Sequence, residues 1–135
     1  MKYRQLVRAA AVYDFVLAAP FAVPGLPSLL FGLLGPLNQT MGGTGFPGFD
    51  PLQTLFVQLM GSLIAVWSVL RIVRPRWEFG VADASARGLF SLHYALLIAA
   101  GGHPLGWFLL VPEVLWGLAQ GVGAAVYRRD ELSTD

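Results

Sequence analysis

Four ionisable side chains lie inside long apolar stretches of this sequence, and they are the residues best suited to chemistry. They are Asp14, Arg87, His93 and Glu113. An ionisable group within a membrane helix is costly, so it indicates a functional site by default. The amide side chains of Gln58 and Gln120 lie in the same kind of stretch and can hydrogen-bond to the charged groups.

The rise of an α-helix, about 1.5 Å per residue, places these side chains at two depths. Asp14, Arg87 and Gln120 fall in the half nearest the basic segments of the chain. We expect Asp14 and Arg87 to form an ion pair there, with Gln120 beside it. Two interpretations are open: a structural pair that fixes helix register, or the polar end of a cavity. A third is that the Arg87 side chain extends to the lipid headgroups.

Glu113 falls in the opposite, outer half with Gln58, and His93 lies between the two layers. We expect Glu113 to hydrogen-bond to Gln58, directly or through His93. A purely structural bond is one interpretation, and a carboxyl group that binds a ligand or handles a proton is the other. Pro112 frees a backbone carbonyl on the preceding turn, which suits the lining of a cavity. Trp116 is the aromatic candidate for lining such a site.

Other kinds of site find no support in the residues. Cysteine is absent, which excludes disulfides and thiolate metal sites. His93 and His103 do not share a depth, so we expect no haem, metal or other cofactor. The GGTG sequence at 42–45 lacks the Lys-Ser or Lys-Thr that completes a phosphate loop. No catalytic triad and no nucleic-acid-binding pattern is present.

The elements that position these residues are predicted to be membrane helices. Hydrophobic residues make up 56% of the 135 residues and charged residues only 13%, which is too apolar for a soluble domain of this size. Four apolar segments are each close to the ~20 residues that cross a bilayer. We expect one all-α domain over residues 1–135, a polytopic membrane four-helix bundle. Its helices are predicted at about 7–23, 52–72, 84–100 and 105–127.

The basic residues predict the orientation of this bundle. They precede the first segment, surround the connection between the second and third, or follow the fourth: Lys2, Arg4, Arg8, Arg71, Arg74, Arg76, Arg87, Arg128 and Arg129. Basic loops are retained on the cytoplasmic side, so both termini are expected inside the inner (plasma) membrane. Asp14 interrupts the apolar stretch that a cleaved signal peptide needs, which favours a retained first helix.

The connections complete this prediction. Residues 28–51 are expected to form an extracytoplasmic loop with a short interfacial helix, and residues 128–135 a frayed tail. Asp83 is the expected N-cap of the third helix. Small residues allow close helix packing, either within one chain or between two chains. These packing residues are Gly61 on the second helix and Gly117, Gly121 and Ala125 on the fourth.

Four features of the chain define a layout. The first helix breaks early, an apolar segment follows it on the outer side, the second helix carries Gly61 and Arg71, and a Gly101-Gly102 turn follows the third helix. This layout resembles the DoxX-like group of small bacterial four-helix membrane proteins. The founding name of that group comes from a subunit of a quinone-linked oxidoreductase, so the resemblance implies an accessory membrane subunit. Asp14 and Glu113 match no motif of the group, and no site residue is transferred from it.

Three functions are therefore weighed. The leading hypothesis is a non-enzymatic accessory or interaction role, with the lipid bilayer and a membrane protein or a second copy as partners. The alternative is a binding protein or carrier for a small apolar or amphipathic ligand, anchored by Glu113. Sterol-isomerase-like four-helix proteins, whose lipid cavity is lined by acidic and aromatic residues, offer an analogy for it. A membrane enzyme with Glu113 and His93 as acid and base is a lesser alternative.

Overall fold

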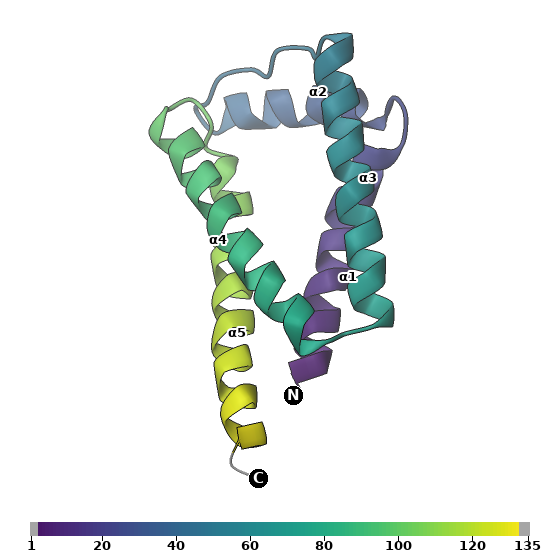
Figure 1. The fold of residues 1–135 in the computed structure, drawn as a ribbon. Helices are drawn as coiled ribbons and strands as arrows, with labels where there is room; N and C mark the ends of the chain where they lie inside the picture. The colour runs from purple at the N-terminus through teal and green to yellow at the C-terminus, as the bar shows by residue number, and fades with distance from the viewer. Residues whose placement is uncertain (1–2, 133–135) are drawn as a thin grey trace.

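The computed structural model describes residues 3–132, with side chains through Tyr127, and this part of the chain is all α-helical (Figure 1). Its five helices are α1 (Tyr3–Ala22), α2 (Leu26–Thr40), α3 (Pro51–Val73), α4 (Trp77–Ala99) and α5 (Gly106–Leu132). The all-α class is confirmed. The helix α2 lies in the region where a short helix was predicted between the first two long ones, although it begins slightly earlier.

The four long helices form two antiparallel pairs instead of the predicted four-helix bundle. Helix α1 packs along α3, and α4 packs along α5, with far fewer contacts between the two pairs. The pairs approach each other at the end that holds the N-terminus and diverge toward the other end (Figure 1). Helix α2 runs across that wider end, from the top of α1 toward the turn between α4 and α5. We call the end that holds the N-terminus the narrow end, and the end that α2 crosses the wide end.

Three of the described helices are long and apolar enough to cross a membrane. They are α1, α3 and the part of α5 from Gly106 to Tyr127. Helix α4 was also predicted to span, but it is not among these three; Asp83 and Arg87 lie within the more apolar part of its 23 residues. Large apolar side chains are exposed along the long helices; Val66, for example, is 70% exposed. Lipid is the solvent that such a surface suits.

A capping box explains where α3 begins, and α4 begins earlier than the sequence predicted. Asp50 and Gln53 form a reciprocal capping box at the start of α3, with N···O distances of 2.7 and 3.1 Å. Helix α4 begins at Trp77, so the prediction that Asp83 caps this helix was wrong. Gly80 lies in the first turns of α4, before the predicted start of this helix, and a β-carbon at this position would collide with the ring of Tyr3. Glycine there lets α4 pass close to α1, which carries Asp83 into the interior.

Small residues hold the helices of each pair together. A β-carbon on Gly61 would lie 2.6 Å from the carbonyl carbon of Phe21, so α1 and α3 are in backbone contact there. On α5, Gly117 faces Arg87 and Gly121 faces Ala84, both on α4. These glycines are therefore used for packing within the chain.

Ala125, which continues the same series along α5, is exposed.

Asn38 joins three segments at the wide end through hydrogen bonds of its side chain. Its fully buried side-chain amide donates to the carbonyl oxygens of Thr44 and Gly102, at 2.7 and 2.9 Å. Its carbonyl oxygen accepts from the backbone N–H of Leu105 at 3.1 Å. One side chain therefore ties α2, the loop that follows it and the α4–α5 turn into one unit.

Candidate functional site

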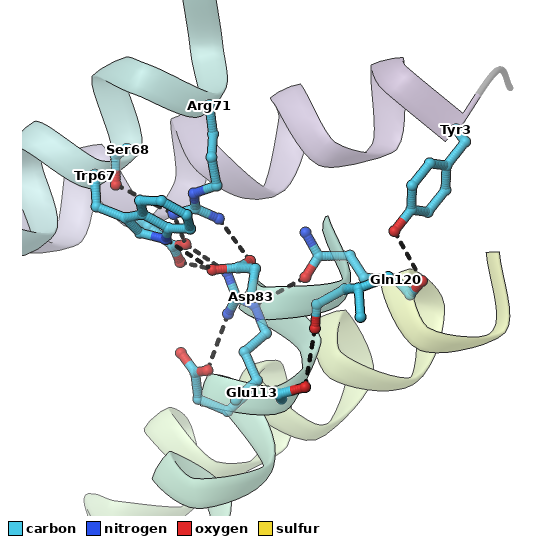
Figure 2. Close-up of polar contacts among 11 residues, drawn as sticks. Tyr3, Trp67, Ser68, Arg71, Asp83, Glu113 and Gln120 are labelled. Carbon is cyan, nitrogen blue, oxygen red and sulfur yellow. Dashed lines mark hydrogen bonds and ion pairs between the residues drawn. The ribbon is translucent and has the colours of Figure 1, made fainter. Parts of the chain in front are cut away.

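A buried network of charged side chains joins the two helix pairs (Figure 2). It consists of Asp14 from α1, Arg71 from α3, Asp83 and Arg87 from α4, and Glu113 from α5. The side chains of Arg71 and Arg87 are only 0% and 2% exposed. Buried charges persist only when they are paired and hydrogen-bonded. The pairing of these five side chains therefore allows their charges to be buried between the two helix pairs.

Arg87 is the centre of this network. Its Nη2 lies 2.5 Å from Asp14 Oδ2, and its Nη1 lies 2.9 Å from Glu113 Oε2. Its Nε lies 3.1 Å from Asp83 Oδ2 and also donates to Gln120 Oε1 at 3.2 Å. The planar guanidinium group has five N–H donors in a fixed fork, which is why one arginine can serve several carboxylates at once.

Arg71 closes a ring of alternating charges. Its Nη2 donates to Asp14 Oδ2 at 2.7 Å, and its Nη1 lies 2.5 Å from Asp83 Oδ2. Asp14 and Asp83 therefore each bridge Arg71 and Arg87. Trp67 supports the ring from α3, because its indole N–H donates to Asp83 at 3.4 Å and its ring lies 5.4 Å from the Arg71 guanidinium carbon. Glu113 stands outside this ring, and among the described side chains it is paired with Arg87 alone.

Residue spacing on α4 and close packing of α5 against α4 bring these side chains together. Asp83 and Arg87 are four residues apart and so share one face of α4. Gly117 brings α5 close to α4 at the level of Arg87, since a β-carbon there would lie 3.3 Å from the Arg87 β-carbon. Gln120, one turn further along α5, is fully buried, and its backbone oxygen accepts from the Tyr3 hydroxyl group at 3.2 Å.

The charges of the network do not balance. Three carboxylates face two guanidinium groups, so one negative charge is in excess when all five groups are ionised. The least buried members are also acidic, because the side chains of Asp14 and Glu113 are 12% and 13% exposed. The accessible edge of the network is therefore acidic, and the two arginines lie behind it.

Aromatic side chains lie beside this acidic edge. The rings of Tyr13 and Trp116 pack with their centroids 5.9 Å apart. Within the network itself, Gln120 Nε2 is a buried donor with no hydrogen-bond acceptor among the described residues. The site can thus accept a proton or a cationic group and offers flat apolar surfaces next to it.

The inner pair of the sequence-based expectation is present in the structure. Asp14 and Arg87 are in contact, and Gln120 lies beside them. The contact excludes the alternative that the Arg87 side chain extends to the headgroups, because it is 2% exposed.

The expected outer layer differs from the structure. Glu113 binds Arg87, whereas the hydrogen bond that the structure gives Gln58 is from Ser62 to its backbone oxygen. His93 is exposed and forms no hydrogen bond or ion pair within the described part of the chain. Depth along the helices did not predict this pair, because the long Arg87 side chain reaches Glu113 from a different depth. A ligand-binding role for Gln58 or His93 stays a prediction.

Arg71 and Asp83 were missed as site residues. Arg71 was placed at the end of the second helix and interpreted as one of the basic residues that set the orientation, and Asp83 was predicted to be a helix cap. Two signals point to them in retrospect. Arg71 continues the small-residue face of α3 three residues after Ser68, and Asp83 stands four residues before Arg87. Such spacings place side chains on one helix face.

No cluster of three histidine or acidic side chains suited to a metal ion occurs among the side chains that the structure describes, those of residues 3–127. No model of a known protein family, no curated protein and no solved structure matches this chain. The geometry of the network is therefore the basis for any proposal about function, and the resemblance to DoxX-like proteins stays a prediction.

Proposed function

We propose that this chain is a small integral membrane protein that binds a small amphipathic ligand through the buried charge network. The observation that carries the proposal is the excess carboxylate at the accessible edge of the network. Asp14 and Glu113 would bind a cationic or hydrogen-bond-donating head group. The rings of Tyr13 and Trp116 would pack against its apolar body.

The unequal attachment of the carboxylates supports a specific role for Glu113. Asp14 and Asp83 each bind both arginines, so their removal would break the ring that joins the helix pairs. Glu113 has one partner, Arg87, and can exchange it for a ligand at lower cost. Ionisable residues in membrane helices face the protein interior and mark ligand or ion pathways, which is consistent with Glu113 as the polar anchor.

We also propose that α4 crosses the membrane with the other long helices, with both chain termini on the cytoplasmic side of the inner membrane. The main obstacle to insertion of α4 is its charge, but Asp83 and Arg87 are paired with each other and with neighbouring helices. Internal pairing hides these charges from lipid. The arginines of the α3–α4 connection and of the α1 N-terminus lie at the same end, as the positive-inside rule requires.

A non-enzymatic accessory role is the second candidate, and one observation favours it. Leu29, Leu33 and Leu37 lie one turn apart on α2 and are 59%, 66% and 48% exposed. A 15-residue helix does not span a bilayer, so this stripe could contact a partner membrane protein or a second copy. The glycines that were candidates for such a contact are used within the chain, which is why ligand binding ranks first.

The Glu113–His93 enzyme hypothesis gains no support. His93 is exposed and Glu113 is bound to Arg87, so the two side chains do not form an acid–base pair.

The test of ligand binding is native mass spectrometry on the protein extracted in mild detergent from its own host membranes. We expect a small molecule that is retained by the wild type and lost in Glu113→Gln. Glu78→Gln is the matched control, because Glu78 is exposed on α4, outside the network, and the substitution removes the same charge. Retention of the same molecule by Glu113→Gln would contradict the proposal. A stoichiometric protein partner that both variants keep would favour the accessory role.

A further inference from the structure

Two basic segments that are far apart in the sequence meet at the narrow end of the molecule. The first turns of α1 contribute Arg4 and Arg8, and the connection between α3 and α4 contributes Arg74 and Arg76. Together they line an open groove of about 600 Å³. The other described lining residues are Gln5, Val73 and Pro75. The described lining therefore carries positive charge and no negative charge.

The groove is held in shape by backbone contacts. Arg8 Nε donates to the carbonyl oxygen of Ile72 at 3.0 Å, which fastens α1 to the last turn of α3. The backbone N–H of Arg74 donates to the carbonyl oxygen of Leu70 at 2.8 Å, which completes the last turn of α3, and the helix ends at Val73, two residues before Pro75. Proline restricts the residue before it to extended backbone. The connection between α3 and α4 is short and contains Pro75, so the backbone positions of Arg74 and Arg76 are restricted.

The groove lies where lipid headgroups would be. Helix α1 has 20 residues, which at 1.5 Å per residue is about 30 Å, the thickness of the hydrocarbon core. Arg4 is near the beginning of this helix, and Arg74 directly follows the last residue of the spanning helix α3. Both residues therefore fall at the boundary between hydrocarbon and water. Val73, which also lines the groove, is an exposed apolar neighbour for the first carbons of an acyl chain.

We propose that this groove binds the phosphate of an anionic phospholipid headgroup. Guanidinium groups bind phosphate in a bidentate manner, and four of them around one groove exceed what a single phosphodiester needs. An anionic headgroup such as that of phosphatidylglycerol leaves a net negative charge to match them, whereas phosphatidylcholine is neutral overall. The site is separate from the buried network and does not depend on the proposed ligand function.

The test is a lipid titration followed by native mass spectrometry, using the full-length protein in mild detergent. Phosphatidylglycerol is expected to bind more tightly than phosphatidylcholine. The double variant Arg74→Gln/Arg76→Gln keeps the Arg8 contact and is expected to weaken phosphatidylglycerol binding by about thirty-fold, from the usual contribution of two basic residues at an anionic surface. The variant Arg74→Lys/Arg76→Lys keeps the charge and is expected to bind more tightly than the glutamine variant.

The control is the same Arg74→Gln/Arg76→Gln variant titrated with phosphatidylcholine, whose headgroup is neutral overall. The loss of two positive charges is expected to leave phosphatidylcholine binding within about two-fold of the wild type, because the arginines add affinity for an anionic headgroup. Equal binding of the two lipids, or an equal loss in this control, would overturn the proposal. Inorganic phosphate that binds as tightly as the lipid would assign the groove to a soluble phosphate compound and would also overturn it.

Discussion

Replacement of Arg87 by methionine tests whether the charge network holds the two helix pairs together. The substitution keeps much of the side-chain volume but removes the guanidinium group that contacts Asp14, Asp83 and Glu113. Arg71 alone then faces three carboxylates, so the excess rises from one negative charge to two. Breaking a buried ion pair by removing one partner typically costs about 3–5 kcal/mol of stability. We expect Arg87→Met to lose an amount in this range.

A second substitution separates the two contributions to this loss. Glu113 depends on Arg87 alone, so Glu113→Gln neutralises the carboxylate that Arg87→Met leaves unpaired. A buried group without its hydrogen-bond partner costs about 1–3 kcal/mol. The double variant should therefore recover about 1–3 kcal/mol relative to Arg87→Met. Asp14→Asn should recover less in the same background, because Asp14 is still paired with Arg71.

The assay is reversible unfolding in detergent, followed by the helical circular dichroism signal as denaturant is added. Arg74→Met is the control, because Arg74 is exposed and outside the network, and exposed charges contribute about 1 kcal/mol or less. The reasoning fails if Arg87→Met unfolds with the same midpoint as this control. It also fails if Glu113→Gln destabilises the Arg87→Met protein further, since that would show a stabilising role for Glu113 without its arginine.

The remaining predictions concern the fold and its orientation. Asn38→Ala removes the three hydrogen bonds of a fully buried side chain at the wide end, and at about 1 kcal/mol for each bond it should cost about 2–4 kcal/mol and speed amide hydrogen exchange there. Gly61→Ala forces a β-carbon against the backbone of α1 and should cost about 1–3 kcal/mol in the same unfolding assay, whereas exposed Gly88→Ala should be neutral or stabilising. The chain has no cysteine, so single cysteines report orientation: a membrane-impermeant maleimide should label intact cells at Gly48→Cys but not at Glu78→Cys. Equal labelling at both sites would refute the proposed topology.

The helical class could be predicted from composition and segment length because membrane insertion depends on local properties. A segment of about twenty apolar residues satisfies its own backbone hydrogen bonds as a helix, whatever its neighbours are. Helices α3 and α5 were located this way to within a few residues at most boundaries. Helix α4 was predicted several residues too short, because Asp83 was predicted to be its N-cap and residues 77–82 to be part of the connection before it, whereas Gly80 of that segment packs against Tyr3 within the helix.

Part of the site could be predicted for the same reason. Asp14 and Arg87 stand out as charges in apolar stretches, and opposite charges at similar depth are expected to pair. The partner of Glu113 could not be predicted. It depends on how far the Arg87 side chain extends across the α4–α5 contact, and that contact is set by Gly117.

The sequence by itself determined that the chain is helical and largely apolar, and that a few charges must be buried with it. Only the tertiary structure decided that Arg71 and Asp83 join those charges, that the long helices form two pairs, and that basic segments from α1 and the α3–α4 connection line one groove. Helix formation depends on neighbours within one or two turns, which the sequence displays directly. Ion-pair partners and grooves depend on which helices pack together, and that choice is made by close contacts between residues far apart in the chain.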